Sequence, residues 1–316
     1  MKILVTGGAG FIGANLVRFL LQHGHAVTVF DNLSVGRREY LADLEIEFVQ
    51  GDILDVEAIN QVVSGHDGIV HLAAQTGVPA SLQNPRRDCE VNVLGTLNVL
   101  EAARAAQERR ARQIRLVFAS SNAPLGRQPP PATEDKAPLP ISPYGASKLA
   151  GEGYCLAYHG SWGLGTVVLR FANVYGPFSA HKSSVVACFF RDIERTGKIT
   201  IDGDGLQTRD FIYVNDLCQA ILLALESDVS GEVFQIATGI ETSIAELAQM
   251  VQAIVGKEVG IRQAPARQGD IRKNYSTIAK VQRLLGWAPQ VSLTEGLSRV
   301  YEWWRTLTSQ TARISY

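Results

Sequence analysis

Close to the N-terminus stands Lys2-Ile-Leu-Val-Thr-Gly-Gly-Ala-Gly-Phe-Ile-Gly13, an apolar run that stops at a cluster of glycines. After Gly7, Gly10 and Gly13, apolar residues recur at helical spacing, so the pattern predicts a strand, a tight turn and a helix. The start of a helix offers free backbone N–H groups and a positive dipole, and glycine lets a ligand come close to the backbone. The turn therefore predicts a dinucleotide pyrophosphate site, with a tight turn that binds nothing as the alternative.

The same alternation of apolar runs and helical stretches continues downstream. Strands are expected at 26–30, 46–49, 68–74, 115–120 and 165–171, and long helices at 92–107 and 144–159. Strands that alternate with helices indicate a parallel sheet covered on both faces. We expect an α/β fold of the Rossmann type, a doubly wound parallel sheet, with the proline-rich stretch 129–143 as a loop over the sheet edge.

The rhythm weakens beyond Gly176 into short strands at 199–201, 232–237 and 259–264, and helices at 243–255 and 293–308. We expect residues 1–175 to form the dinucleotide-binding domain and to carry the catalytic groups. Residues 176–316 then form a smaller α/β lobe for the substrate, and the chain is expected to cross between the lobes around 205–240. The last eight residues show no pattern.

Composition narrows the possible partners. The 316 residues allow two lobes, 46% hydrophobic and 19% charged residues are typical of a globular protein, and the net charge is -1. No overall field attracts nucleic acid or an anionic membrane, and no apolar run approaches the roughly 18 residues of a membrane span. Four scattered cysteines suggest neither a metal site nor a disulfide framework. We expect a soluble cytoplasmic protein without metal, nucleic acid or membrane partners.

Acidic residues after the second and third strands complete the dinucleotide site. Asp31 follows the glycine turn by roughly 20 residues, where a carboxylate accepts ribose hydroxyls and repels a 2′-phosphate. The cofactor is therefore expected to be NAD, although Arg37 and Arg38 nearby leave NADP open. Asp52 and Ile53 suit the adenine edge, and Asp52 could instead cap a helix.

Tyr144 and Lys148 are four residues apart at a helix start, so both side chains lie on one face. An ammonium group there stabilises a phenolate and lowers the tyrosine pKa, as general base catalysis at a hydroxyl requires. The alternative is an amphipathic helix start with the tyrosine packed inward. Ser120 and Ser121, at the end of the preceding strand, supply hydroxyls for a sugar oxygen or for an ordinary turn.

With these motifs the chain resembles the extended short-chain dehydrogenase/reductases, in particular the NAD-dependent sugar epimerase/dehydratase family and most closely its nucleotide-sugar 4-epimerases. The resemblance covers nearly the whole length. It rests on Thr6-Gly-Gly-Ala-Gly-Phe-Ile-Gly13, Asp31-Asn-Leu-Ser34, Gly51-Asp-Ile53, His71-Leu-Ala-Ala74, Asn92, Ser120-Ser121, Pro143-Tyr144-Gly-Ala-Ser-Lys148, Arg170-Phe-Ala-Asn173, Arg209-Asp-Phe-Ile-Tyr-Val214 and Arg267-Gln-Gly-Asp270.

The resemblance implies roles for individual residues. Tyr144 transfers the proton, Lys148 binds the nicotinamide ribose and tunes Tyr144, and Ser121 hydrogen-bonds the reacting 4-hydroxyl. The implied cofactor contacts are Gly7, Gly10, Phe11, Ile12, Gly13, Asp31, Asn32, Ser34, Gly36, Asp52, Ile53, Leu72, Ala73, Ala74, Gln75, Asn92, Ser120, Tyr144, Lys148 and Phe171. The implied substrate contacts are Thr76, Ser121, Asn122, Asn173, Val185, Arg209, Arg267, Asp270 and Asn274. A homodimer through the helices at 92–107 and 144–159 is also implied.

The residues after Ser121 favour one reaction among those of the family. Related dehydratases carry an Asp-Glu pair and related decarboxylases a Glu beside the catalytic hydroxyl, whereas this chain has Asn122 and Ala123. Neither can act as the acid or base of an elimination. We expect 4-epimerisation of UDP-hexoses through a 4-keto sugar. The alternatives are a UDP-sugar dehydratase acting by 4,6- or 5,6-elimination, a UDP-uronate epimerase or decarboxylase, and a non-catalytic NAD-dependent regulator.

Departures from the family pattern bear on specificity. Leu125 and Phe171 replace more usual aromatic residues, and Asn274 stands where the resemblance places the residue that limits room around the sugar C2 substituent. Asn has intermediate volume and can bond an acetamido group, so we expect N-acetyl sugars to be accepted as well. The polar segment 179–184 could touch phosphate or sugar or be an exposed loop. His71 is expected to pack or hydrogen-bond locally rather than act as a base.

Overall fold

One parallel sheet organises the first lobe. The structure, a computed structural model, describes residues 1–256, 259–266 and 272–314. Seven strands pair in the order β11-β6-β5-β4-β1-β2-β3, every neighbour parallel, which confirms the predicted doubly wound sheet. The strands are β1 (Lys2–Thr6), β2 (Ala26–Asp31), β3 (Glu47–Gln50), β4 (Gly68–His71), β5 (Arg115–Ser121), β6 (Gly165–Phe171) and β11 (Glu232–Ile236).

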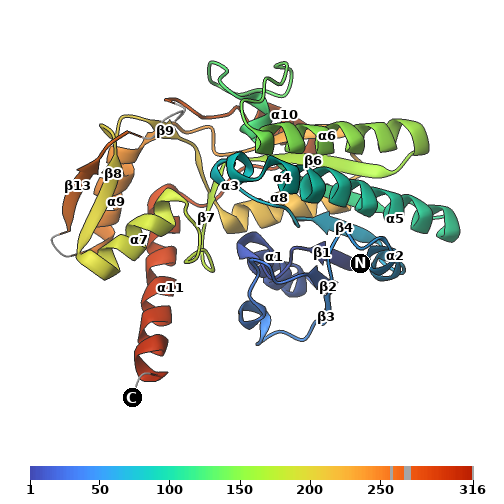
Figure 1. Ribbon diagram of the computed structural model, residues 1–316, viewed down its shortest axis with the longest axis horizontal. Coiled ribbons are helices and arrows are strands. Elements are labelled where there is room, and N and C mark those ends of the chain that lie inside the picture. The colour runs from blue at the N-terminus through green and yellow to red at the C-terminus, as the bar shows by residue number, and fades with distance from the viewer. Residues whose placement is uncertain (257–258, 267–271, 315–316) are drawn as a thin grey trace.

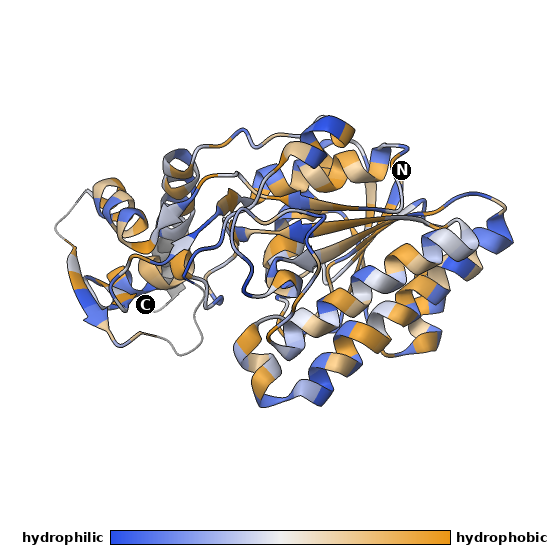
Figure 2. Ribbon diagram, turned by 90° about the horizontal axis from the view of Figure 1, so that it is seen from above, coloured by the Kyte–Doolittle hydropathy of each residue, from blue (hydrophilic) through white to orange (hydrophobic). Residues whose placement is uncertain are grey.

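Helices cover both faces of this sheet (Figures 1 and 2). In β1, Ile3 and Val5 pack with α1 (Phe11–Gln22) and α8 (Val214–Glu226), while Leu4 packs on the opposite face. That face carries α2 (Val56–Val63), α5 (Gly95–Arg110) and α6 (Pro143–Trp162). Each such fully buried aliphatic side chain contributes about 1.5–3 kcal/mol. Burial on both faces explains why the strands are apolar runs without alternation.

Between β4 and α5 the chain forms a series of short helices. They are α3 (Val78–Gln83), α4 (Pro85–Cys89) and η2 (Glu90–Leu94). The helix predicted at 92–107 therefore begins at Gly95 and ends at Arg110, because its first residues belong to the wider turn of η2. Two further single turns are η1 (Arg38–Leu41) and η3 (Ala123–Leu125).

The second lobe has a separate core, in which Phe189, Phe190, Leu247 and Trp304 are buried. Its strands pair two by two: β7 (Asn173–Tyr175) with β10 (Phe211–Tyr213), β9 (Thr208–Arg209) with β12 (Thr242–Ser243), and β8 (Lys198–Asp202) with β13 (Gly260–Ala264). Its helices are α7 (Val185–Thr196), α9 (Ile244–Val255) and α11 (Leu293–Ile314). The helix α10 (Ala279–Leu285) instead packs on β11 of the large sheet, and its Val281 is buried in the core of the first lobe.

The chain crosses between the lobes more than once. After β10 it returns to the large sheet, where α8 packs on α1 and β11 pairs with β6 along Glu232–Ile236. The short strand expected at 232–237 is thus the edge of the large sheet, inside the segment where a crossing was expected.

The C-terminal helix is longer than the sequence indicated. The helix expected to end at 308 continues to Ile314, so the absence of a pattern in the last eight residues was misleading. Residues 309–314 hold few apolar residues at helical spacing, and Figure 1 shows α11 projecting away from its lobe there. Within the described parts of the chain, each helix is too short or too polar to cross a lipid bilayer.

Candidate active site

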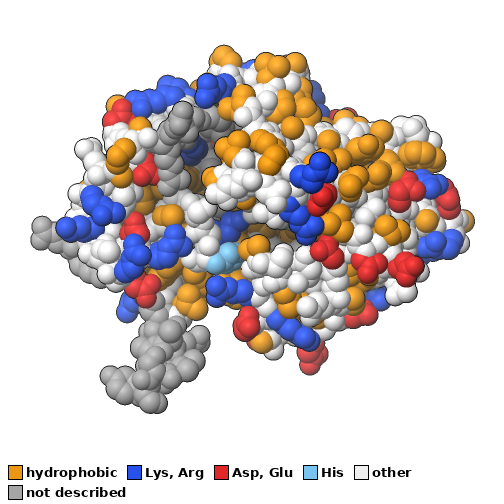
Figure 3. Space-filling view, viewed as in Figure 1, with side chains coloured by type: hydrophobic (Ala, Val, Ile, Leu, Met, Phe, Trp, Pro, Cys, Tyr) orange, Lys and Arg blue, Asp and Glu red, His pale blue; other side chains and the backbone are white. Residues whose placement is uncertain are grey.

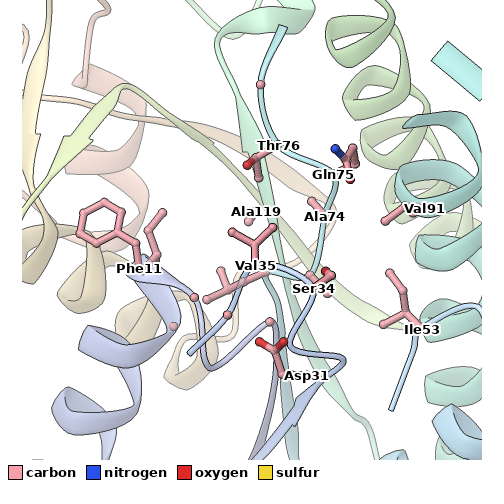
Figure 4. A pocket seen from close by; sticks show the side chains of 18 of the residues that line it. Phe11, Asp31, Ser34, Val35, Ile53, Ala74, Gln75, Thr76, Val91 and Ala119 are labelled. Atoms are coloured by element: carbon pink, nitrogen blue, oxygen red, sulfur yellow. The ribbon is translucent and has the colours of Figure 1, made fainter. Parts of the chain in front are cut away.

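A cavity of about 490 Å³ lies at the carboxyl ends of the sheet strands (Figure 4). The strand order reverses between β1 and β4, and open α/β sheets bind ligands at such a switch point. The cavity is lined by nearly all of the residues expected at the cofactor: Gly7, Gly10, Phe11, Ile12, Gly13, Asp31, Asn32, Ser34, Gly36, Asp52, Ile53, Leu72, Ala73, Ala74, Gln75, Ser120, Tyr144, Lys148 and Phe171. Thr76 and Ser121, expected at the substrate, also line it.

The glycine turn is packed so tightly that side chains are excluded. Gly7 has a φ of +71°, and a Cβ there would lie 2.7 Å from the backbone nitrogen of Ala73. A Cβ on Gly13 would lie 2.4 Å from the Gly7 carbonyl oxygen. Gly10 begins α1 without a side-chain cap, so the first N–H groups of the helix can bond an anion. These features fit a pyrophosphate.

Asp31 presents a carboxylate to the cavity. One oxygen accepts the Ala9 N–H at 3.0 Å and the other the Leu33 N–H at 2.8 Å. Burial raises the pKa of Asp31, and these two backbone bonds oppose that shift. A Cβ on Gly36 would lie 2.9 Å from both oxygens, so glycine leaves the carboxylate open to ribose hydroxyls.

The end of the cavity that contains Asp31 and Asp52 is held by polar contacts between neighbouring loops. Asn32 donates to Asp52 at 3.0 Å, and the other oxygen of Asp52 accepts the Leu54 N–H at 2.9 Å. Arg87, from α4, lies 3.8 Å from Asp52 and lines the same cavity. Arg87 could not be predicted from the sequence, because an exposed arginine on a short helix is ordinary.

Lys148 is buried near the opposite end of the cavity. It is 3% exposed, and its ammonium donates to the Ala119 carbonyl at 2.9 Å and lies 4.9 Å from the Phe118 ring centroid. Burial lowers the pKa of Lys148 to about 8, although the negative charge of Asp88 opposes the shift. The side chain is therefore a cation that titrates near neutral pH.

Tyr144 is hydrogen-bonded to Ser121, one helical turn before Lys148. Burial raises the pKa of Tyr144 to about 12, and the hydrogen bond from Ser121 lowers it only in part. The sequence predicted that Lys148 lowers the pKa of Tyr144, and this prediction was wrong. Desolvation of the phenolate raises the pKa of Tyr144 by more than the hydrogen bond from Ser121 lowers it.

A buried ion pair supports the floor of the site. Glu152 of α6 and Arg170 of β6 are 3% and 4% exposed and are joined by hydrogen bonds of 2.9 and 2.7 Å. Ser120 donates to the same carboxylate at 2.5 Å. The cavity-lining serine is therefore fixed by a charged partner.

Several of the expected residues lie outside this cavity. Asn92 lies behind it, where its amide bonds both backbone groups of Gln75 and also Asp88 and Ser147. Asn122 donates to Ser276 at 3.1 Å, and Asn274 is partly buried without lining the cavity. Arg267 and Asp270 lie outside the described residues.

His71 is enclosed between two hydroxyls, Thr6 at 2.7 Å and Thr96 at 3.0 Å. Burial, aided by the positive charge of Lys148, lowers its pKa to about 3. This geometry agrees with the expectation that His71 hydrogen-bonds locally.

A second cavity of about 200 Å³ lies in the smaller lobe and is lined by Asn173, Val185 and Arg209, all expected at the substrate. Val174 lines both cavities, so the two adjoin. The polar segment 179–184 is divided between them, with His181 and Lys182 on the larger cavity and Ser183 and Ser184 on the smaller. Its sequence alone left this open.

Sequence comparison identifies the family. A sequence model described as the NAD dependent epimerase/dehydratase family matches residues 3–237. The chain belongs to this family. Its cofactor is accordingly NAD, and the cavity at the glycine turn fits that group.

Relatives span the full length of the chain. A UDP-glucose 4-epimerase of Mycolicibacterium smegmatis is 38% identical over 96% of this chain and 99% of its own length. A dTDP-glucose 4,6-dehydratase of Streptomyces niveus is 36% identical over 96% of this chain and 93% of its own length. The crystal structure of the Thermotoga maritima UDP-glucose 4-epimerase with UDP-glucose superposes with a TM-score of 0.90 at 38% identity, covering 98% and 100% of the two chains. Relatives of this chain thus catalyse more than one reaction.

Proposed function

We propose that the protein is an NAD-dependent nucleotide-sugar 4-epimerase that acts on UDP-hexoses through a transient 4-keto sugar. The observation that carries the proposal is the distribution of acids in the larger cavity. Among the described residues that line it, the carboxylates are Asp31 and Asp52, both at the adenosine end. Asn122 is bonded to Ser276, and Ala123 offers only its backbone N–H to Ser121 at 3.2 Å. Asp88, whose negative charge also raises the pKa of Tyr144, does not line the cavity. Among the described lining residues, no carboxylic acid beside Tyr144 is thus available to eliminate water from the sugar.

The reaction needs one hydroxyl to lose and regain a proton. NAD, when bound, would supply the acceptor and later the donor of the hydride at sugar C4, and the positive charge of its oxidised ring would favour a phenolate nearby. Ser121 holds the 4-hydroxyl, and Tyr144 takes the hydroxyl proton as C4 loses its hydride. The 4-keto sugar then rotates in the site, and when the hydride returns to the opposite face of the ketone, Tyr144 gives the proton back to O4. The proton that Tyr144 takes and the hydride that leaves C4 are therefore both returned to the sugar in each turnover.

Lys148 and Asn92 have supporting parts in this proposal. The Lys148 ammonium, which bonds the Ala119 carbonyl, is proposed to bind the nicotinamide ribose and to favour the Tyr144 phenolate, which would offset the raised pKa of that tyrosine. Asn92 acts as a positioning residue, because it ties the loop at Gln75 to Ser147 on the helix of the catalytic pair.

The smaller cavity is proposed to hold the nucleotide of the substrate. Asn173 and Arg209 supply polar groups there, and Arg267 and Asp270 are proposed to complete the site from outside the described residues. Residues 1–175 are proposed to bind the cofactor and residues 176–316 the substrate, apart from the segments that return to the large sheet, which carry α8, β11 and α10. Asn274 is proposed to admit N-acetyl sugars as well as plain hexoses.

The second candidate is a dehydratase or a uronate epimerase or decarboxylase. It is favoured by the range of relatives, which includes a 4,6-dehydratase at 36% identity, a UDP-glucuronate 4-epimerase at 33% and a UDP-N-acetyl-alpha-D-glucosaminuronate decarboxylase at 31%. Dehydration and decarboxylation leave products that are lighter by water and by carbon dioxide, whereas a uronate epimerase leaves the mass unchanged and is recognised by its turnover of UDP-glucuronate.

The test is to incubate the purified protein, without added cofactor, with UDP-glucose, UDP-GlcNAc or UDP-glucuronate and to follow products by NMR and mass spectrometry. The proposal predicts 4-epimers of unchanged mass from UDP-glucose and UDP-GlcNAc. Turnover of UDP-glucose without turnover of UDP-GlcNAc would refute the proposal that Asn274 admits N-acetyl sugars. Tyr144→Phe should abolish turnover, and Tyr301→Phe in α11, which lines neither cavity, serves as the matched control.

We also propose a homodimer through α5 and α6, as the family resemblance implies. The two helices pack together, and α6 exposes Tyr154, Leu156 and Trp162 by 39%, 37% and 48%. Light scattering should give twice the 34.3 kDa chain mass, and Trp162→Glu should shift the protein toward monomer.

A further inference from the structure

A short segment of the second lobe reaches over the cofactor cavity. Residues 178–182, here called the strap, lie between β7 and α7. Arg191 of α7 donates to two strap carbonyls, those of Ala180 at 2.9 Å and Lys182 at 3.0 Å. Asn15 of α1 donates at 3.0 Å to the carbonyl just before the strap. The strap is therefore fastened to both lobes.

Two strap side chains contact opposite walls of the cavity. The Lys182 ammonium lies 3.4 Å from the Thr76 hydroxyl, in the loop after β4. The His181 ring lies 3.5 Å from the Tyr40 hydroxyl, in η1 after β2. In the sheet, β1 lies between β2 and β4, and the glycine turn follows β1. Because His181 and Lys182 both line the cavity, the strap crosses its mouth above the glycine turn.

The strap brings positive charge that the protein does not neutralise. Burial lowers the pKa of Lys182, and no charged group among the described residues offsets this shift. The pKa of His181 is lowered by burial and then by the positive charges of Lys182 and Arg37. Arg37 is itself next to the glycine turn, since its backbone N–H donates to the Ala9 carbonyl at 2.9 Å. Figure 3 shows Lys, Arg and His side chains gathered around the hollow between the lobes.

A partly buried cation whose nearest contact is a neutral hydroxyl is unfavourable unless an anionic ligand neutralises its charge. The group expected at the glycine turn, a pyrophosphate, carries two negative charges. We infer that the strap is a clamp on bound NAD, in which the Lys182 ammonium bonds the cofactor pyrophosphate from the side opposite the glycine turn. NAD then leaves only after the strap has moved away from Thr76 and Tyr40. The clamp serves whichever sugar reaction the enzyme catalyses.

The experiment measures how fast NAD leaves, not how fast sugar turns over. The purified holoenzyme is diluted into a trap that consumes free NAD, and the NAD still bound is followed with time. Losing a charge-assisted hydrogen bond should make release from Lys182→Met about 10- to 100-fold faster. Lys182→Arg, which keeps the charge, should release NAD at close to the wild-type rate. A higher salt concentration should reduce the difference in NAD release rate between Lys182→Met and wild type.

The matched control is Lys198→Met, an exposed lysine on β8 that does not line the cavity. It should release NAD at the wild-type rate. The KM for the sugar nucleotide, measured with saturating NAD, should not change in Lys182→Met. If Lys182→Met released NAD at the wild-type rate but had a raised KM for the sugar nucleotide, the inference would be overturned, and Lys182 would be assigned to binding the substrate diphosphate. Equally fast release from the Met and Arg variants would overturn it too, because charge would then have no part.

Discussion

The buried pair of Glu152 and Arg170 gives the sharpest prediction about stability. Replacing Glu152 by Gln leaves the Arg170 guanidinium, 4% exposed, without its only ion-pair partner in the described chain. Three hydrogen bonds of 2.5 to 2.9 Å then lose a charged acceptor. Removing one member of a buried pair costs about 3–5 kcal/mol, because the remaining charge stays desolvated.

The assay is urea unfolding at pH 7 with the same excess of NAD for every variant, since bound cofactor adds to stability. Glu295→Gln is the matched control, because its partner Arg299 is bonded at 2.6 Å while both side chains are about half exposed. That change should cost less than about 1 kcal/mol. The double variant Glu152→Gln/Arg170→Met should recover part of the loss. A loss at Glu152→Gln no larger than that at Glu295→Gln would refute the reasoning.

Three further predictions follow from buried groups near the site. The pKa of His71 is about 3 in the folded protein and 6.5 in the unfolded chain, so the contribution of the neutral ring to stability is present above pH 6.5 and is lost as the pH falls. In chemical unfolding, the free energy of unfolding should be about 2 kcal/mol lower at pH 5 than above pH 6.5, and His71→Gln should remove this pH dependence. Lys148→Met should be inactive, but with NAD removed it should be up to about 3 kcal/mol more stable to unfolding than wild type at pH 7, because the pKa of Lys148 is about 8 in the folded protein and 10.5 in the unfolded chain. The stability of wild type should rise between these two pH values until it equals that of the variant, and equal stability at pH 7 would count against the burial argument. Gly13→Ala should abolish NAD retention, because its Cβ would lie 2.4 Å from the Gly7 oxygen, whereas Gly160→Ala, with open space around its Cβ, should keep NAD; measured NAD content decides between them.

Local patterns predicted the cofactor cavity well. The glycine turn and the Tyr144/Lys148 spacing are set within a few residues, and the parallel sheet then brings their strand ends to one edge. Residues defined by long-range contact were harder to predict. Arg87 has no local signature, and the segment 179–184 could be assigned to the two cavities only from its contacts with the loops after β2 and β4.

The strand at 232–236 was hard to place for the same reason, since a short apolar run does not reveal its partner strand. The pKa of Tyr144 shows a different limit. The spacing of Tyr144 and Lys148 was sufficient to predict their proximity on one helix face, but not the burial that dominates the pKa. Desolvation depends on everything packed around a group, which a motif does not contain.

The most direct test of the proposed epimerisation follows the hydrogen at sugar C4. UDP-glucose carrying deuterium at C4 is incubated with the protein in ordinary water, without added NAD, and the deuterium is located in the product by NMR. The account predicts UDP-galactose with the deuterium still at C4, because the hydride returns to the carbon it left. Deuterium at C6 of a product lighter by one water would contradict it and establish a 4,6-dehydratase instead.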